Sequence, residues 1–252
     1  MNGLQYLDYG LDTIDYTTNL PNPVVKVYDG VKVVRDDLID GGTKRRAFYV
    51  YIKSKPDIEE FVYASPRQGY AQLSLAYVCK DLGRRATVTV PQGKRYWLTD
   101  KAEELGANII EVPMGFLTHI QYVAKEYCLD SGAHLIPFGG DHPMIVRAMC
   151  EVAKSLNINP KEVWSVMSSG VLSRGLQMAW PNAIVYGVKI GHNTKKQEQG
   201  TARCLRSKYK FQQECKKIER PPFPSSLTYD SKAWSFIKEK ATKGALFWNV
   251  GK

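Results

Sequence analysis

A lysine that stands one residue after a pair of glycines is the first residue in the chain whose type and setting could do chemistry. In the run Gly41-Gly42-Thr43-Lys44, the glycines allow positive φ angles and a close approach of the backbone to a ligand. A lysine amine can form a Schiff base with an aldehyde cofactor if its pKa is lowered, and the neighbouring cations Arg45 and Arg46 would help to lower it. Taken alone, the run also fits an ordinary turn before a basic helix.

A second run combines small residues with hydroxyl groups. Ser168-Ser169-Gly170-Val171-Leu172-Ser173 lies between an expected strand and an expected helix. Free backbone N–H groups at a helix N-terminus bind phosphate well, and serine hydroxyls add further donors. We therefore predict that these six residues bind the phosphate of a cofactor. A plain loop before a capped helix is the alternative interpretation.

Two further loops also follow strands and could face a substrate. Ser65-Pro66-Arg67-Gln68-Gly69-Tyr70 precedes a helix, where backbone N–H groups and Arg67 could bind a carboxylate and Tyr70 could stack or donate a hydrogen bond. Pro137 to Pro143 contains a second pair of glycines. The predicted substrate-binding residues are Ser65, Arg67, Gln68, Gly69, Gln72 and Gly140. A tight turn is the alternative for each loop.

The elements that must position these residues alternate along the chain. Asp29-Gly30 between alternating apolar residues predicts a hairpin over 24–34. Further strands are expected at 61–64, 86–91, 108–112, 133–137, 163–167 and 183–188, separated by helices at 72–82, 99–105, 116–129, 144–156 and 174–179. This order predicts an α/β fold of mostly parallel twisted sheets with helices on both faces. Ligands of such sheets bind in the loops that follow strands, where the candidate residues lie.

The order of these motifs resembles that of the fold-type II (tryptophan synthase β-like) enzymes, which depend on pyridoxal 5′-phosphate (PLP). It is most similar to the branch that contains 1-aminocyclopropane-1-carboxylate deaminase and D-cysteine desulfhydrase. The family's Lys-Arg-Asp-Asp-Leu run with Gly-Gly-Asn-Lys looks like Arg35 to Lys44, and its Ser-Asn-His segment looks like 65–82. Its Pro-x-Gly-Gly-Ser-x-Pro segment looks like 137–143, and its Gly-Ser-Gly-Gly-Thr loop looks like 168–172. Its Tyr-x-Gly-Lys-Ala segment looks like Tyr229 to Ala233, and its terminal Thr-Gly-Gly looks like 249–251. The similarity spans roughly residues 23 to 252.

This resemblance implies a cofactor, a set of roles and a domain organisation. PLP would be held by Lys44 as a Schiff base, Tyr70 would lie where the family has an asparagine beside the cofactor, and Tyr229 would be a second acid or base. Val250 replaces the family's terminal threonine near the pyridine nitrogen. The larger, PLP-binding lobe is expected to comprise 1–48 and 134–252, with a smaller α/β lobe at 49–133, and the assembly is expected to be a homodimer.

Three functions remain open from the sequence. The leading prediction is a PLP-dependent lyase, deaminase or decarboxylase acting at the α-carbon of a small amino-acid or amine substrate. The alternative is a PLP enzyme that acts on an amino-acid moiety attached to a nucleotide or DNA base, as in bacteriophage thymidine hypermodification. It draws on the net charge of +10 and on segment 195–217, where eight Lys and Arg stand against Glu198 and Glu214. That segment also fits a solvated surface. A non-catalytic binding protein with a PLP fold is the third possibility.

Composition bears on the kinds of site and the cellular compartment that we expect for the protein. The five cysteines and four histidines of the 252-residue chain are dispersed, so neither a disulfide framework nor a metal site is expected. No run of about 18 apolar residues is present, so we expect no membrane-spanning helix. The start Met1 to Tyr6 lacks the features of a secretory signal. Together these features predict a cytoplasmic protein, in the host cytoplasm if it is viral.

Overall fold

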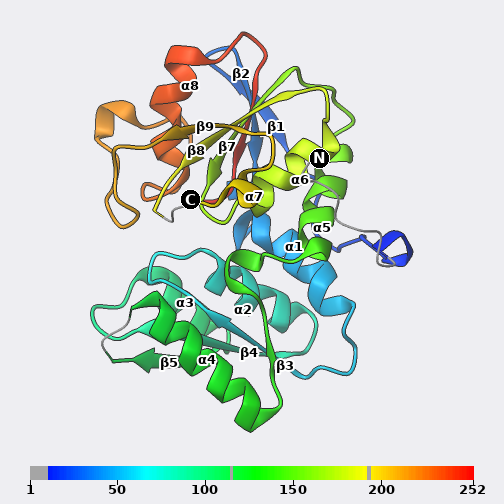
Figure 1. Cartoon of the computed structure of the whole chain (residues 1–252), viewed down its shortest axis with the longest axis vertical. Coiled ribbons are helices and arrows are strands. Elements are labelled where there is room, and N and C mark those ends of the chain that lie inside the picture. Colours follow the sequence, from blue (N-terminus) through cyan, green and yellow to red (C-terminus); the bar gives the residue numbers. More distant parts are fainter. Residues whose placement is uncertain (1–10, 114–115, 192–193) are drawn as a thin grey trace.

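Two sheets form the framework of the molecule and occupy opposite halves of it (Figure 1). The computed structural model describes residues 11–113, 116–191 and 194–252. Within them, one sheet has six strands in the order β1-β2-β10-β7-β8-β9, and the other has four in the order β5-β4-β3-β6. The β1–β2 hairpin is antiparallel, and the other pairs in these residues are parallel. The predicted α/β class with mostly parallel sheets is therefore confirmed.

The predicted elements lie within three residues of their expected bounds. The six-stranded sheet contains β1 (Val25–Tyr28), β2 (Val31–Arg35), β7 (Glu162–Met167), β8 (Ile184–Lys189), β9 (Arg203–Arg206) and β10 (Leu246–Asn249). The four-stranded sheet contains β3 (Glu60–Ala64), β4 (Arg85–Pro91), β5 (Asn108–Val112) and β6 (His134–Leu135). The helices are α1 (Gly42–Lys53), α2 (Ala71–Asp81), α3 (Trp97–Glu104), α4 (Leu117–Ser131), α5 (Pro143–Lys154), α6 (Val171–Ala179), α7 (Lys196–Gln199) and α8 (Trp234–Lys240).

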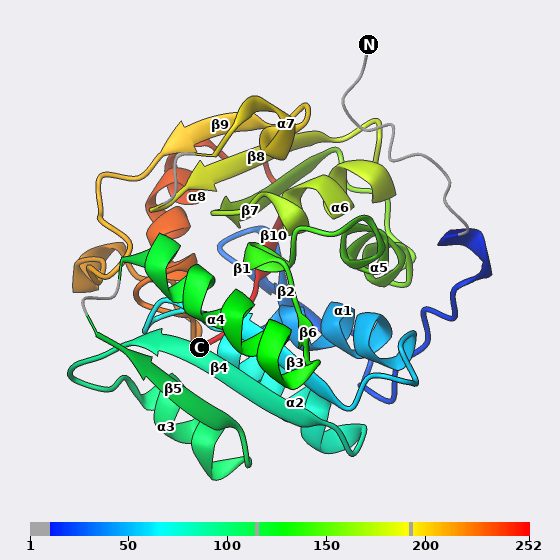
Figure 2. The same ribbon diagram turned by 60° about the horizontal axis from the view of Figure 1, so that its bottom comes forward.

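Helices cover both faces of each sheet, as the alternation of strands and helices predicted. Figure 2 shows α4 on one side of the four-stranded sheet and α2 and α3 on the other. In the six-stranded sheet, successive residues of β7 enter different apolar clusters: Val163 packs with Leu176 of α6, and Trp164 packs with Trp234 of α8. This alternation follows from the two-residue period of a strand.

One segment contains more structure than the sequence indicated. Residues 195–217 fit a solvated surface in the sequence, but besides the short helix α7 the segment contains the edge strand β9. β9 pairs in parallel with β8, from Tyr186 opposite Arg203 to Lys189 opposite Arg206. The strand shows no hydrophobic pattern, because it lies at the sheet edge with an exposed arginine at each end and only partly buried residues between them.

We propose two lobes close to those expected from the sequence, with one boundary moved. The expected larger lobe began at residue 134, but His134 and Leu135 of β6 pair with Phe61 and Val62 of β3. The boundary is therefore better placed after β6. Helix α1 connects the lobes, because its buried residues share an apolar cluster with α2 and α5.

Four expectations concerned features that would be absent. Of the helices in the described part of the chain, none has the length and apolar character needed to cross a bilayer. The same residues contain no group of three or more His, Cys, Asp or Glu side chains suited to a metal ion. All five cysteines are free thiols. The segment Met1 to Tyr6, predicted not to be a secretory signal, lies outside the described residues.

A buried charged network fixes the start of α1 against the six-stranded sheet. Arg46 donates from Nε and Nη2 to Oδ1 of Asp36 at 3.0 and 2.9 Å. The other carboxylate oxygen of Asp36 accepts from Oγ1 of Thr43 at 2.9 Å and from Nε1 of Trp248 at 3.2 Å. Asp36 is fully buried. Because Lys44 lies between Thr43 and Arg46 in α1, this network sets its position.

We predict that Arg46→Leu destabilises the fold far more than Arg45→Leu. Losing Arg46 leaves the buried Asp36 carboxylate without its ion-pair partner, which costs about 3–5 kcal/mol. The ion pair of Arg45 with Asp81 lies in a more exposed setting, where the cost is about 1 kcal/mol or less. Urea unfolding measures both free energies. Equal losses in the two variants would contradict the role of the network.

Candidate active site

A pocket with an empty volume of about 1020 Å³, part of it in its open mouth, is lined by residues from both halves of the molecule. On the side of the six-stranded sheet, it lies at the carboxyl ends of β7 and β10. On the other side, it is bounded by the loop that precedes α2. Ten predicted site residues line it: Lys44, Gln68, Gly69, Tyr70, Ser168, Ser169, Gly170, Val171, Leu172 and Tyr229. The structure thus brings together residues from four separate sequence segments.

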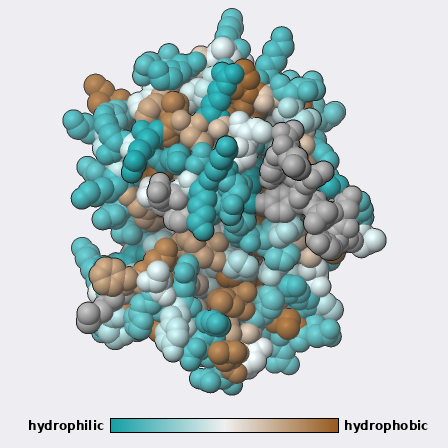
Figure 3. All heavy atoms as spheres, in the orientation of Figure 1, coloured by the Kyte–Doolittle hydropathy of each residue, from teal (hydrophilic) through white to brown (hydrophobic). Residues whose placement is uncertain are grey.

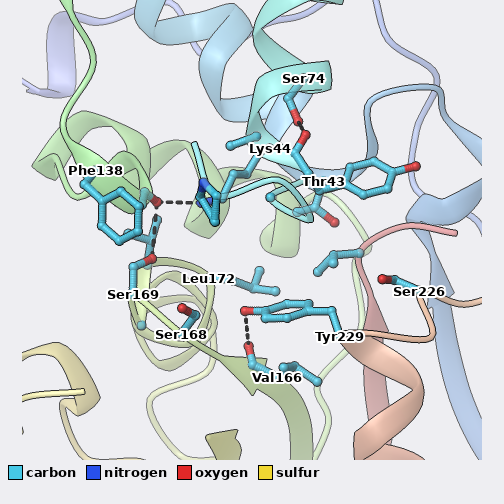
Figure 4. Close-up of a pocket in the computed structure, with 18 of the residues that line it drawn as sticks. Thr43, Lys44, Ser74, Phe138, Val166, Ser168, Ser169, Leu172, Ser226 and Tyr229 are labelled. Atoms are coloured by element: carbon cyan, nitrogen blue, oxygen red, sulfur yellow. Dashed lines mark hydrogen bonds between the residues drawn. The ribbon is translucent and has the colours of Figure 1, made fainter. Parts of the chain in front are cut away.

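Lys44 lies in the first turn of α1 and its side chain reaches into the pocket. Its Nζ donates to the carbonyl oxygen of Gly139 at 2.6 Å, a bond drawn in Figure 4. The preceding glycine, Gly42, has a φ of +63°, and a Cβ there would lie 2.2 Å from the carbonyl oxygen of Val250. A glycine at position 42 therefore lets the end of the chain pack against the start of α1.

The pKa of the Lys44 amine is lowered to about 8, and burial is the main cause. Asp141 opposes this shift, because a nearby negative charge favours the protonated amine. The expectation that Arg45 and Arg46 lower this pKa is wrong. Their guanidinium groups form ion pairs with Asp81 and Asp36 instead.

The predicted phosphate-binding loop connects β7 to α6. Gly170 caps the helix with a φ of +73°, and a Cβ there would lie 1.9 Å from the carbonyl oxygen of Glu198. Only glycine lets α7 pack so closely against the loop. Beyond it, the first N–H groups of α6 have no partners within the helix. Ser168 and Ser169 line the same part of the pocket, as Figure 4 shows, so the loop presents both kinds of donor.

Five predicted site residues do not line the pocket: Ser65, Arg67, Gln72, Gly140 and Ser173. Ser173 is buried, and its Oγ accepts from Nε2 of Gln177 at 3.1 Å. Gln72 is fully buried as well, and its Nε2 donates to the carbonyls of Arg67 and Gly69 at 2.9 and 3.0 Å. The Arg67 side chain donates to the carbonyl of Pro91 at 3.2 Å. Gln72 therefore shapes the loop that presents Gln68 and Gly69.

The other two residues that do not line the pocket, Ser65 and Gly140, make local contacts instead. The Oγ of Ser65 donates to the carbonyl of Pro66 at 3.0 Å, inside the loop. A Cβ on Gly140 would lie 3.0 Å from the Phe48 ring, so this glycine serves the packing of the core.

Gly139, which the sequence did not single out, organises the pocket wall. Its carbonyl oxygen accepts from Lys44 and, at 3.2 Å, from Oγ of Ser169. Its N–H donates to the hydroxyl of Tyr63 at 3.0 Å. Tyr63 lies within a strand that the sequence indicated as apolar core, and only the tertiary fold directs its hydroxyl to the pocket. The pair Gly139-Gly140 was visible in the sequence, but nothing there identified which glycine would line the site.

The two predicted tyrosines of the site remain protonated near neutral pH. Burial raises the pKa of Tyr229 above its usual value, and its hydroxyl donates to the carbonyl of Val166 at 3.5 Å (Figure 4). Burial also raises the pKa of Tyr70 to about 12, and its hydroxyl donates to the carbonyl of Lys252 at 3.1 Å. Both phenols can therefore donate hydrogen bonds, and neither is a base at neutral pH.

Asp230 is a further buried polar residue that the sequence did not identify. One carboxyl oxygen accepts from the N–H of Val250 at 3.2 Å. The other has no hydrogen-bond partner among the described residues. Burial raises the pKa of this carboxyl well above its ordinary value, and nearby Asp37 adds to the effect. Its neighbours Tyr229 and Val250 both line the pocket, which places an unsatisfied acid directly behind the wall.

Comparisons with known proteins bear on the fold of this chain. No protein-family model matches the sequence. The chain is 24% identical over 244 residues to a glycyl-dTMP PLP-dependent decarboxylase of Pseudomonas phage M6, with 83% of this chain and 87% of that protein covered.

Solved structures show the fold more clearly. An ACC deaminase homologue has a TM-score of 0.81 at 12% identity, covering 96% of this chain and 94% of that one. Threonine deaminase isoform 2 from Solanum lycopersicum has a TM-score of 0.75 at 14% identity, covering 96% and 82%. Maize serine racemase has a TM-score of 0.69 at 12% identity, covering 91% and 88%. These are fold-type II PLP enzymes, so the predicted resemblance in fold is confirmed.

We predict that Gly170→Ala destabilises the protein more than Gly83→Ala. Both glycines have positive φ, +73° and +63°, so alanine costs about 1–2 kcal/mol of backbone strain at either site. Around Gly83 the space is open, whereas at Gly170 the new methyl group meets Glu198 and adds about 1–3 kcal/mol. Urea unfolding gives the difference. Proteolysis near α7 should accelerate only in Gly170→Ala, and equal behaviour of the two variants would contradict this packing.

We also predict a distinctive pH dependence for labelling of Lys44. Only the neutral amine reacts with an acylating reagent, so its rate should rise with pH and level off just above the pKa of about 8. In urea-unfolded protein, burial is lost and the midpoint should move towards the ordinary lysine pKa of about 10.4. Trace labelling with peptide mass spectrometry measures both curves. Identical midpoints in folded and unfolded protein would exclude the lowered pKa.

Proposed function

We propose that this protein is a PLP-dependent enzyme that breaks a bond at the α-carbon of an amino-acid substrate, with Lys44 as its cofactor-binding residue. One observation carries the proposal: a buried amine with a pKa of about 8 shares a pocket with a glycine-capped helix N-terminus suited to phosphate. The fold shared with PLP enzymes and the phage decarboxylase relative support it.

The residues present fit PLP at both ends of the molecule. The loop Ser168 to Leu172 would hold the phosphate, and Gly170 leaves no room for a side chain at its turn. Lys44 would hold the aldehyde carbon covalently through its amine. Asp230, which lies behind the pocket wall with one unpartnered carboxyl oxygen, would be the candidate partner of the pyridine nitrogen, in place of the threonine that Val250 replaces. Tyr70, packed between Gly42 and Gly251, would bound the ring.

The chemistry follows from the charge states of these side chains. When bound, PLP withdraws electrons from the α-carbon of an attached amine and so eases the breaking of a bond there. Lys44, with a pKa of about 8, can accept or deliver a proton near neutral pH. Tyr229 remains a neutral phenol and can donate a hydrogen bond to the substrate. The apolar residues Phe138, Val166 and Leu172 help to exclude water from the pocket.

A second candidate substrate is an amino acid attached to a nucleotide. It is compatible with the name of the phage relative, which contains glycyl-dTMP, and the net charge of +10 suits an anionic substrate. In this version, the pocket receives the amino-acid end while the nucleotide lies outside. We place the protein in the cytoplasm, or the host cytoplasm if it is viral, because its five cysteines are free thiols. A homodimer remains a prediction.

We predict that the purified protein with added PLP absorbs at about 410–430 nm, the range of a lysine-bound cofactor. Lys44→Ala should lose this band, because the amine that forms the covalent bond is gone. Lys53→Ala should keep it, since that exposed lysine pairs with Asp15 at the other end of α1. A wild-type protein that stays colourless after addition of PLP would refute the proposal.

The same band reports on the substrate. Free amino acids and amino-acid-modified thymidine nucleotides are screened for shifts of the bound band, and positive compounds are assayed for released carbon dioxide and ammonia. Carbon dioxide alone indicates a decarboxylase, and ammonia indicates a deaminase. A shift without product would mean that the protein binds PLP and amine without catalysis.

A further inference from the structure

Three neighbouring strands end at the same edge of the six-stranded sheet. The last residue of β7, Met167, is in register with Lys189, the last residue of β8. Lys189 is in register with Arg206, the last residue of β9. Adjacent strands lie about 4.8 Å apart, so these cations follow the phosphate-binding loop along one edge. The residues that bind the cofactor and the cations beside them therefore belong to one continuous row.

A groove at this edge is rich in positive charge. It is lined by Lys189, Gly191, Cys204, Leu205, Arg206, Ser207, Lys208, Tyr209, Lys210, Phe211 and Gln212. None of these lining residues is acidic. Lys208 pairs with Glu219 at 2.6 Å, but no carboxylate of the described residues forms an ion pair with Lys189, Arg206 or Lys210. Like charges that converge without counter-charges repel one another, and a bound anion relieves this repulsion.

Phe211 joins the groove to the cofactor pocket, because it lines both. Its ring lies 6.4 Å from that of Tyr229 in an edge-on arrangement. A Cβ on Gly191 would lie 2.9 Å from the Phe211 Cβ, so glycine admits this close packing after β8. Buried Lys232 donates to the carbonyls of Lys210 and Phe211 at 2.8 and 2.9 Å. The boundary between the two sites is thus firmly held.

We propose that this groove binds the phosphate of a nucleotide whose base carries the amino acid into the cofactor pocket. The proposal rests on the proposed function and specifies its substrate class. Lys189, Arg206 and Lys210 contact the phosphate, and Phe211 supplies an aromatic surface for the base. A small free amino acid carries its carboxylate on the α-carbon, which lies in the cofactor pocket, so it has no second anion for this groove. A nucleotide has both groups that the groove can bind. Its phosphate suits the three cations without counter-charges, and its base suits the aromatic ring beside them.

The test compares ligands that differ by one group. Isothermal titration of the PLP-loaded protein uses dTMP, thymidine and a short single-stranded thymidine oligonucleotide at fixed low salt. We expect dTMP to bind at least about tenfold more tightly than thymidine, because charge-assisted bonds to phosphate are strong. The double variant Lys189→Gln/Arg206→Gln should lose about this factor for dTMP and little for thymidine. Phe211→Leu should weaken both ligands.

A matched control removes two charges elsewhere in the basic segment. Lys216→Gln/Lys217→Gln changes two exposed lysines outside the groove and should leave dTMP affinity within about twofold. The oligonucleotide separates the sources of phosphate. If only it binds, and binding is lost in the Lys189/Arg206 variant, the groove accepts DNA phosphates; if dTMP binds, it accepts a mononucleotide. Equal losses in both double variants, or no phosphate-dependent binding by either ligand, would overturn the proposal.

The cofactor band keeps this test separate from the proposed function. Both double variants should retain absorption at about 410–430 nm, because none of the four altered side chains lines the cofactor pocket. A normal band with no nucleotide binding would refute the groove and leave PLP chemistry standing. Loss of the band in wild type would refute the proposed function, while phosphate-dependent dTMP binding could still be measured.

Discussion

The pairing of two adjacent buried carboxylates underlies the rest of this structure. Asp36 pairs with Arg46 of α1, and Asp37 pairs with Arg35 at the end of β2. Asp37 also accepts from the side chain of Asn249 at 2.7 Å, which ties in the end of β10. Buried carboxylates are tolerated only when such partners surround them. The bonds of these carboxylates therefore hold the ends of β2 and β10 and the start of α1 together. This junction positions Lys44 in the pocket.

Burial then sets the pKa values of the ionisable side chains beside this junction. The lysine amine is activated because the two lobes enclose it, whereas the neighbouring arginines are used in ion pairs. The same enclosure keeps Tyr229 and Tyr70 protonated, since removing their protons would create buried anions. One physical cause thus lowers the pKa of the amine and raises that of the phenols. A base and neutral hydrogen-bond donors coexist in the site near neutral pH.

The parallel sheet explains why a second binding surface can lie beside the first. Its strands deliver their carboxyl ends to one edge, so the proposed phosphate-binding loop after β7 and the cations that end β8 and β9 are neighbours. On the face shown in Figure 3, hydrophilic side chains predominate and apolar residues are scattered among them. The cations that make up the net charge of +10 do not all have the same surroundings. Some of them line the groove beside Phe211, whereas others only face solvent.

The sequence by itself determined the elements and the loops that carry the site, because strand and helix periods, Asp29-Gly30 and the Gly-Gly pairs are local signals. It missed β9, since an edge strand that is only partly buried shows no apolar pattern. Within the loops, only the tertiary structure decided which side chains face the pocket. Gly139 rather than Gly140 lines it, Gln72 supports its loop, and Asp230 lies behind its wall. Side-chain direction and burial depend on what packs across the lobes, and that packing is set by contacts between residues far apart in the chain.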